Sequence, residues 1–165
     1  MSAWRADLAA CGRQPGIRQA IVAWFANPGF ELACHYRAAR WATDKGAWGR
    51  IAASLVERRM ITRFGCQISR RARIGPGLRL PHPLGIVIGE GAVIGAGATV
   101  YHGVTLGRRW AETANYPRLG DDVTLFCGAT LLGSVILPDR AIVGAQRVML
   151  GDAPASTPLA LTLVS

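Results

Sequence analysis

A six-residue repeat constrains this chain more than any other feature. Between positions 86 and 107, apolar residues return every six positions in two interleaved series. The first series is Ile86, Ala92, Ala98 and Val104, and the second is Ile88, Ile94, Val100 and Leu106. The series lie two residues apart, so each unit contains one apolar-x-apolar step. This step is read as a very short strand whose two apolar side chains point to the same side. Strands this short do not build an ordinary sheet, and a six-residue period is typical of a parallel β-helix.

The repeat extends in both directions from this stretch. On the N-terminal side its members are Ile68, Ala72, Ile74, Leu78, Leu80 and Leu84, and the pattern shifts by two residues before Ile86. On the C-terminal side it resumes with Leu119, Leu125, Leu131, Leu137, Val143 and Met149. The interruption, residues 108–118, is polar and aperiodic. Insertions in repeat proteins usually form loops on one face, often the binding face, so we predict a functional loop here.

The chain before the repeat has a helical period. Residues 3–11, 17–26, 30–43 and 48–64 are predicted helices, because Pro-Gly breaks at 15–16 and 28–29 separate the first three. In the third helix the predicted buried face is Phe30, Ala33, Cys34, Ala38 and Trp41, and in the fourth it is Ile51, Leu55, Met60 and Ile61. The sequence therefore predicts an α+β fold: a helical region at 1–66, a parallel β-helix of hexapeptide repeats at 67–150 with its loop at 108–118, and a tail at 151–165.

Composition adds a strong positive charge. The chain has 19 Lys and Arg against 10 Asp and Glu, and half of its residues are hydrophobic, which is enough for a globular core. The excess of arginine favours an anionic partner. Six arginines fall between positions 58 and 73: Arg58, Arg59, Arg63, Arg70, Arg71 and Arg73. This run is interpreted either as a solvated face or as a surface for an acidic glycan or peripheral membrane contact. No nucleic-acid motif accompanies it, so no nucleic-acid partner is expected.

The four cysteines and the apolar runs bear on location. Cys11, Cys34, Cys66 and Cys127 form no CxxC pair, so neither a zinc site nor a disulfide framework is predicted. The apolar run at 20–26 is far shorter than the roughly 20 residues that a transmembrane helix needs. We therefore expect a cytoplasmic protein with no transmembrane segment.

Two segments carry a resemblance to a known family. Residues 78–107 (LRLPHPLGIVIGEGAVIGAGATVYHGVTLG) and 116–145 (YPRLGDDVTLFCGATLLGSVILPDRAIVGA) resemble serine O-acetyltransferases and related hexapeptide-repeat acyltransferases. Upstream, residues 12–16 and 27–42 resemble the helical segment of the shorter members. The resemblance implies a left-handed β-helix, a homotrimer, acetyl-CoA as the acetyl donor and an active site between adjacent subunits.

Acetyl transfer to a hydroxyl needs a base, and the resemblance assigns this role to His82. An imidazole is suited to proton removal at neutral pH, and Pro81 and Pro83 would hold His82 in a fixed orientation. His102 is interpreted as a second, hydrogen-bonding residue of the acceptor site. His35 lies in the helical region, where we expect a structural role. No metal is predicted, because only two histidines fall in the repeats.

The donor side also follows from the resemblance. Small residues should line a groove for the thin pantetheine arm, and the matching positions are Gly107, Cys127 and Ala145. Arginines are expected to meet the phosphates of acetyl-CoA, and Arg108, Arg109 and Arg147 lie in the right region.

The acceptor side departs from the family pattern. Pro81 and Gln67 stand where the serine enzymes carry aspartates, and Asn115 and Tyr116 replace an arginine and a histidine of the loop. Gln67 can orient His82 by a hydrogen bond, but it cannot stabilise an imidazolium as a carboxylate does. The acceptor is therefore left open between serine and a sugar or polysaccharide hydroxyl. A binding or assembly protein that lost the activity is the remaining alternative.

Overall fold

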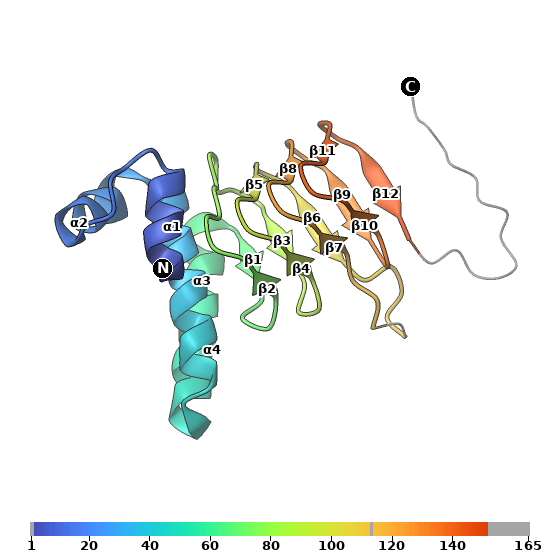
Figure 1. Cartoon of the computed structure of the whole chain (residues 1–165). Helices are drawn as coiled ribbons and strands as arrows, with labels where there is room; N and C mark the ends of the chain where they lie inside the picture. Colours follow the sequence, from blue (N-terminus) through green and yellow to red (C-terminus); the bar gives the residue numbers. More distant parts are fainter. Residues whose placement is uncertain (1, 113, 152–165) are drawn as a thin grey trace, which may run out of the picture.

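In the described part of the chain, four helices precede a coiled stack of short strands (Figure 1). The computed structural model describes residues 2–112 and 114–151. The helices are α1 (Ala3–Ala10), α2 (Ile17–Ala26), α3 (Pro28–Thr43) and α4 (Gly46–Phe64). All four predicted helices are present. The tail predicted at 151–165 lies outside the described residues, apart from Gly151.

The strands form three parallel sheets, one for each side of the coil. The first contains β1 (Gln67–Ile68), β3 (Val87–Ile88), β6 (Thr105–Gly107), β9 (Thr130–Leu132) and β12 (Val148–Leu150). The second contains β2 (Arg73–Ile74), β4 (Val93–Ile94), β7 (Arg118–Leu119) and β10 (Ile136–Leu137). The third contains β5 (Thr99–Val100), β8 (Thr124–Leu125) and β11 (Ile142–Val143). The predicted α+β class and the parallel β-helix are therefore confirmed.

The register of the first sheet shows where the coils differ in length. Val87 pairs with Thr105, eighteen residues on, which is three six-residue units. Gln67 pairs with Val87, twenty residues on, and Thr105 pairs with Thr130, twenty-five residues on. The first excess is the two-residue shift before Ile86, and the second is the loop predicted at 108–118. The sheet thus stays in register by placing every extra residue at a turn between strands.

The interior of the coil is filled by the apolar series. Inward residues of the repeat are buried, and five of them, Ile68, Ile88, Val100, Leu106 and Leu125, are at most 1% exposed. The prediction for Leu84 was wrong, because its side chain is 66% exposed. Leu84 falls in the longer turn after His82, and the two extra residues there turn it outward while Ile86 takes the inward position.

The helices cover the first coil through direct contacts from α3. A β-carbon on Gly29 would collide with the carbonyl oxygen of Leu80, so only glycine allows this approach. The hydroxyl of Tyr36 donates to the carbonyl oxygen of Ala72 at 2.8 Å. These contacts close the open end of the coil with a helix instead of another strand.

A buried ion pair fastens the helices to the same coil. Asp7 on α1 accepts hydrogen bonds from the guanidinium of Arg37 at 3.0 and 3.1 Å, and from the backbone N–H groups of Gly77 and Leu78 at 2.8 and 2.9 Å. Arg37 also donates to the carbonyl oxygens of Ile74 and Gly75, both at 2.6 Å. Because Asp7 is fully buried, removal of either partner would leave an uncompensated charge.

The predicted buried faces of α3 and α4 were partly wrong. On α3, Phe30 and Ala33 are buried as predicted, but Ala38 and Trp41 are exposed. The rest of the buried face comes from Leu32, Tyr36 and Ala39. On α4 only Met60 of the predicted anchors is buried, while Ile51, Leu55 and Ile61 are about half exposed or more, at 53%, 64% and 49%. Apolar residues at helical spacing occur on more than one face of these helices. Packing against α4 and the first coil determines which face of α3 is buried.

Candidate functional site

One corner of the β-helix collects several of the predicted site residues. It joins the third sheet to the first, and its turns stack through backbone hydrogen bonds from Gly103 N to Leu84 O, Gly128 N to His102 O and Gln146 N to Cys127 O, at 2.8 to 2.9 Å. We call His82, His102, Cys127 and Ala145 the histidine corner. Because consecutive turns stack, His102, Cys127 and Ala145 form a column of equivalent positions, and His82 lies in the turn of the preceding coil, two residues before the equivalent Leu84.

Left-handed backbone conformations shape this corner. Gly85, Gly103, Gly128 and Gln146 occupy equivalent places in successive turns, with φ angles of 65°, 67°, 69° and 57°. Residues with a β-carbon adopt this conformation at a cost of about 1 to 2 kcal/mol, which explains the glycines of the repeat. The sharp turns leave the residues just before them on the outer surface.

His82 lies exposed at the first turn of the column. Its carbonyl oxygen accepts a hydrogen bond from Leu84 N at 2.9 Å, which tightens the Pro-flanked turn. The ring centroid of His82 lies 6.1 Å from that of His102 and 6.2 Å from that of Tyr101. The two histidines predicted for the site are therefore neighbours, with an aromatic ring beside them.

Two aromatic residues at this corner were missed in the sequence. Tyr101 stacks on Phe126, with ring centroids 5.2 Å apart and ring planes 18° apart. The register that pairs Thr99 with Thr124 places them in adjacent coils, each directly after an inward residue. Both residues directly follow equivalent inward positions of the six-residue repeat. This equivalence was the sequence signal that could have predicted their contact.

The opposite edge of the first sheet carries the remaining loop and donor positions. We call Gly107, Arg108, Asn115 and Tyr116 the loop corner. Here the polypeptide leaves β6 for the insertion that ends at β7 (Figure 1). Arg108 donates to the carbonyl oxygen of Ala111 at 3.1 Å, and Asn115 is exposed. The predicted pantetheine positions are therefore divided between two corners of one chain.

Tyr116 anchors the end of the insertion on the coil below. A β-carbon on Gly89 would lie 2.5 Å from Cε1 of Tyr116, and one on Gly91 would collide with the same ring. The ring is half-buried over these two glycines. The two glycines thus leave the space that the Tyr116 ring occupies at the end of the insertion.

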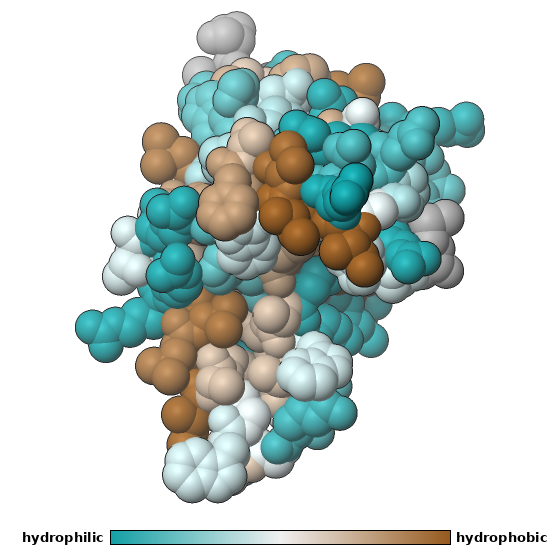
Figure 2. All heavy atoms as spheres, turned by 90° about the vertical axis from the view of Figure 1, so that its left-hand side faces the viewer, coloured by the Kyte–Doolittle hydropathy of each residue, from teal (hydrophilic) through white to brown (hydrophobic). Residues whose placement is uncertain are grey.

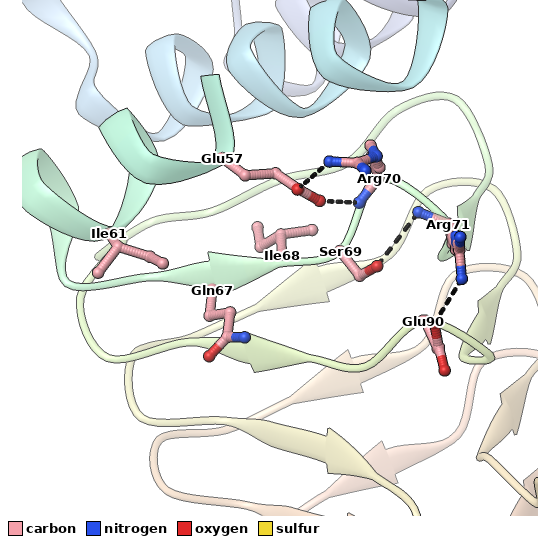
Figure 3. A pocket seen from close by; sticks show the side chains of 8 residues that line it. All are labelled: Glu57, Ile61, Gln67, Ile68, Ser69, Arg70, Arg71 and Glu90. Carbon is pink, nitrogen blue, oxygen red and sulfur yellow. Dashed lines mark hydrogen bonds and ion pairs between the residues drawn. The ribbon is translucent and has the colours of Figure 1, made fainter. Parts of the chain in front are cut away.

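Gln67 lines a hollow of about 290 Å³ between α4 and the first two turns (Figure 3). Its lining includes Glu57, which accepts a hydrogen bond from Arg70 N at 2.8 Å, and Arg71, which pairs with Glu90 at 3.2 Å. Within residues 2–112 and 114–151, no hydrogen bond joins Gln67 to His82. The role assigned to Gln67 stays a prediction.

His35 and most arginines of the basic run have structural partners. His35 is buried, with Nδ1 2.8 Å from the carbonyl oxygen of Glu31, and its Nε2 accepts from Arg59 at 3.2 Å. Arg63 binds both carboxylate oxygens of Glu31, at 2.7 and 3.0 Å. Together with Arg70 and Arg71, these contacts engage four of the six arginines of the basic run within the chain. Ala145 and Arg147, two of the positions predicted to bind acetyl-CoA, are both exposed.

The cysteine thiols are unpaired, and three of them have a raised pKa. All four cysteines are free. Burial raises the pKa of the thiols of Cys11 and Cys66, and raises that of Cys34 to about 12. In the part of the chain that the structure describes, no three His, Cys, Asp or Glu side chains gather as a metal-binding group. Among the same residues, no helix combines the length and apolarity needed to cross a bilayer.

Comparison with known proteins defines the class of this fold. No family model matches the sequence. Neisseria gonorrhoeae serine acetyltransferase superposes with a TM-score of 0.79 at 32% identity, covering 92% of this chain and 59% of that one. A serine acetyltransferase solved in complex with CoA gives a TM-score of 0.76 at 25% identity, covering 92% and 62%. The fold is therefore the left-handed β-helix of the hexapeptide-repeat acyltransferases, and the hand expected from the resemblance is confirmed.

Sequence relatives identify the family within that class. Serine acetyltransferase of Helicobacter pylori is 39% identical over 142 residues, which cover 85% of this chain and 81% of that protein. The Synechococcus elongatus serine acetyltransferase is 33% identical over 146 residues, 86% of this chain, but the match spans only 58% of that protein. The chain belongs to the serine acetyltransferase family.

Proposed function

We propose that this protein transfers the acetyl group of acetyl-CoA to a hydroxyl group, with His82 as the general base. The observation that carries the proposal is the histidine corner. It presents an exposed imidazole between two prolines, a second histidine 6.1 Å away and a column of small residues beyond them. The serine acetyltransferases among its relatives support the same reaction, and one of their solved structures is a complex with CoA.

His82 would act on the proton of the acceptor. A ring nitrogen of His82 takes the hydroxyl proton while the oxygen attacks the thioester carbonyl carbon. As the carbon–sulfur bond breaks, the imidazolium returns that proton to the departing sulfur, so CoA leaves as the thiol. The stiff Pro81-His82-Pro83 turn keeps the imidazole oriented for both transfers.

The active site would require two copies of the chain. The histidine corner and the loop corner lie at opposite edges of the first sheet, so a single copy does not assemble all the predicted positions. In a closed ring, each contact joins one surface of a copy to a different surface of the next. A homotrimer would thus bring Gly107 and Arg108 of one copy toward Cys127 and Ala145 of its neighbour, with pantetheine between them.

Serine is the first candidate acceptor, because the named relatives are serine acetyltransferases. A sugar hydroxyl is the second candidate. It is favoured by the neutral Gln67, Asn115 and Tyr116 and by the exposed ring of Phe126 near the histidines, since an aromatic face suits the apolar face of a sugar. The four free cysteines fit a reducing compartment, so the proposal places the reaction in the cytoplasm.

An acceptor panel tests the proposal. Purified protein is mixed with acetyl-CoA and either serine, a series of hexoses or no acceptor, and CoA thiol release is followed over time. We expect serine-dependent release well above the rate without acceptor. Release with a hexose alone would select the second candidate. Binding of acetyl-CoA with no release for any hydroxyl would instead identify a non-catalytic binding protein.

A further inference from the structure

The outermost helix of the molecule exposes apolar side chains to solvent. α2 projects from the body at the end opposite the last coil (Figure 1). Its Ile17, Ile21, Val22 and Phe25 are 72%, 56%, 50% and 83% exposed. Figure 2, which faces this end of the molecule, shows hydrophobic (brown) surface in its upper half and a second hydrophobic area lower down. We call these four residues the α2 patch, and exposed apolar patches of this kind mark interaction sites.

The α2 patch borders an apolar hollow of about 430 Å³. Its walls come from α1, α2 and α3, and Trp4, Ile17, Ile21, Trp24, Phe25 and Phe30 are among the lining residues. No charged side chain lines it. The hollow and the patch together form one apolar surface with two tryptophans in its wall, and tryptophan is enriched at the boundary between lipid and water.

Two exposed arginines, Arg5 on α1 and Arg18 on α2, directly follow residues of this apolar surface in the chain. Residues 2–27 contain Arg5, Arg13 and Arg18 against a single acid, Asp7. Asp7 is buried and bound to Arg37, so it does not neutralise the outer face. Arg5 and Arg18 are exposed, and the Arg5 guanidinium lies 5.3 Å from the centroid of the Trp4 ring. Cations therefore flank the patch with no exposed carboxylate among residues 2–27.

We propose that α2 docks this protein on an anionic lipid surface. Ile17, Ile21 and Phe25 enter the boundary between headgroups and acyl chains, and Arg5 and Arg18 bind lipid phosphates. A second copy of this chain is disfavoured as the occupant, because two identical faces would bring uncompensated arginines together. The helix would lie on the membrane, in keeping with its ten residues.

Vesicle sedimentation tests this proposal independently of the acetyltransferase assay. The whole protein is mixed with vesicles of phosphatidylcholine alone or with phosphatidylglycerol added. We expect binding to the anionic vesicles that weakens as salt is raised from low to physiological concentration. No binding to anionic vesicles, or equal binding to both compositions, would overturn the proposal.

Two variants with matched exposure locate the contact. Phe25 on α2 is 83% exposed and Trp48 on α4 is 82% exposed. Phe25→Ser should weaken vesicle binding by about tenfold or more, from the apolar area no longer transferred from water. Trp48→Ser should bind as the unchanged protein does. Equal losses for both variants would contradict the assignment to α2. A change of oligomeric state in Phe25→Ser, measured by ultracentrifugation without lipid, would make a second copy the occupant instead.

Discussion

The histidine corner and the loop corner flank the same sheet, but they are built in different ways. Turns of the regular repeat make the first, and its stacked hydrogen bonds from Gly103, Gly128 and Gln146 recur with each coil. A seven-residue excess makes the second, and it is held by the ring of Tyr116 on two glycines. The repeat thus fixes the proposed base His82 and the small residues beside it, while a less regular segment supplies the residues best placed to vary with the acceptor.

The largest expected difference between the two corners is catalytic. His82→Ala should lower kcat/KM for CoA release by about 10²- to 10⁴-fold, because no base then takes the hydroxyl proton. The free energy of unfolding should stay unchanged, since His82 is exposed. Asn115→Ala at the loop corner should mainly raise KM for the acceptor. A His82→Ala protein that keeps most of its activity would remove His82 from the mechanism.

Glycine substitutions should separate the corners by stability. Gly103 has φ of 67° and nothing closer than 3.5 Å to an added β-carbon, so Gly103→Ala should cost about 1 to 2 kcal/mol of backbone strain in urea unfolding. In Gly91→Ala the three atoms nearest to the added β-carbon all belong to the Tyr116 ring, so the end of the insertion is the part that has to shift. That variant should lose less stability and raise KM for the acceptor. The reverse order of the two stability losses would contradict this account of the corners.

Thiol labelling should show a smaller effect, confined to the histidine corner. Cys127 is half-buried beside the proposed pantetheine groove, so CoA should slow its alkylation several-fold at pH 8. Cys34 provides an internal control. Burial raises its pKa to about 12, so the thiol stays protonated at pH 8 and should react slowly with or without CoA. Alkylation of Cys127 at one rate in both samples would argue against the groove.

Much of the fold could be predicted from the sequence because the same six-residue pattern of apolar residues recurs in every coil. Each inward position from Ile68 to Val143 is one of many equivalent residues, so one error such as Leu84 changes little. The helices offered no such redundancy. On α3 and α4 several apolar phases were available, and contacts with the first coil decided that Tyr36 turns inward while Trp41 stays exposed.

The site was harder to predict because it depends on distances between turns. That His82 and His102 are neighbours follows from the stacking of equivalent turns, and the same stacking places Tyr101 on Phe126. Contacts of the insertion could not be read in this way. Nothing in the period indicates that Tyr116 packs on Gly89 and Gly91, because the insertion has no equivalent in other coils.

Mixing two variants, each impaired at one corner, tests most directly the claim that the corners of neighbouring copies form one site. His82→Ala and Tyr116→Ala proteins are denatured, combined in equal amounts and refolded together. Random ring-shaped trimers should recover about a quarter of the unchanged protein's CoA release, because one contact in four then joins two intact corners. Either variant refolded alone should stay at its own low rate when the acceptor concentration is far below the KM of the Tyr116→Ala protein. Mixed trimers that stay as inactive as the separate variants would contradict the shared site.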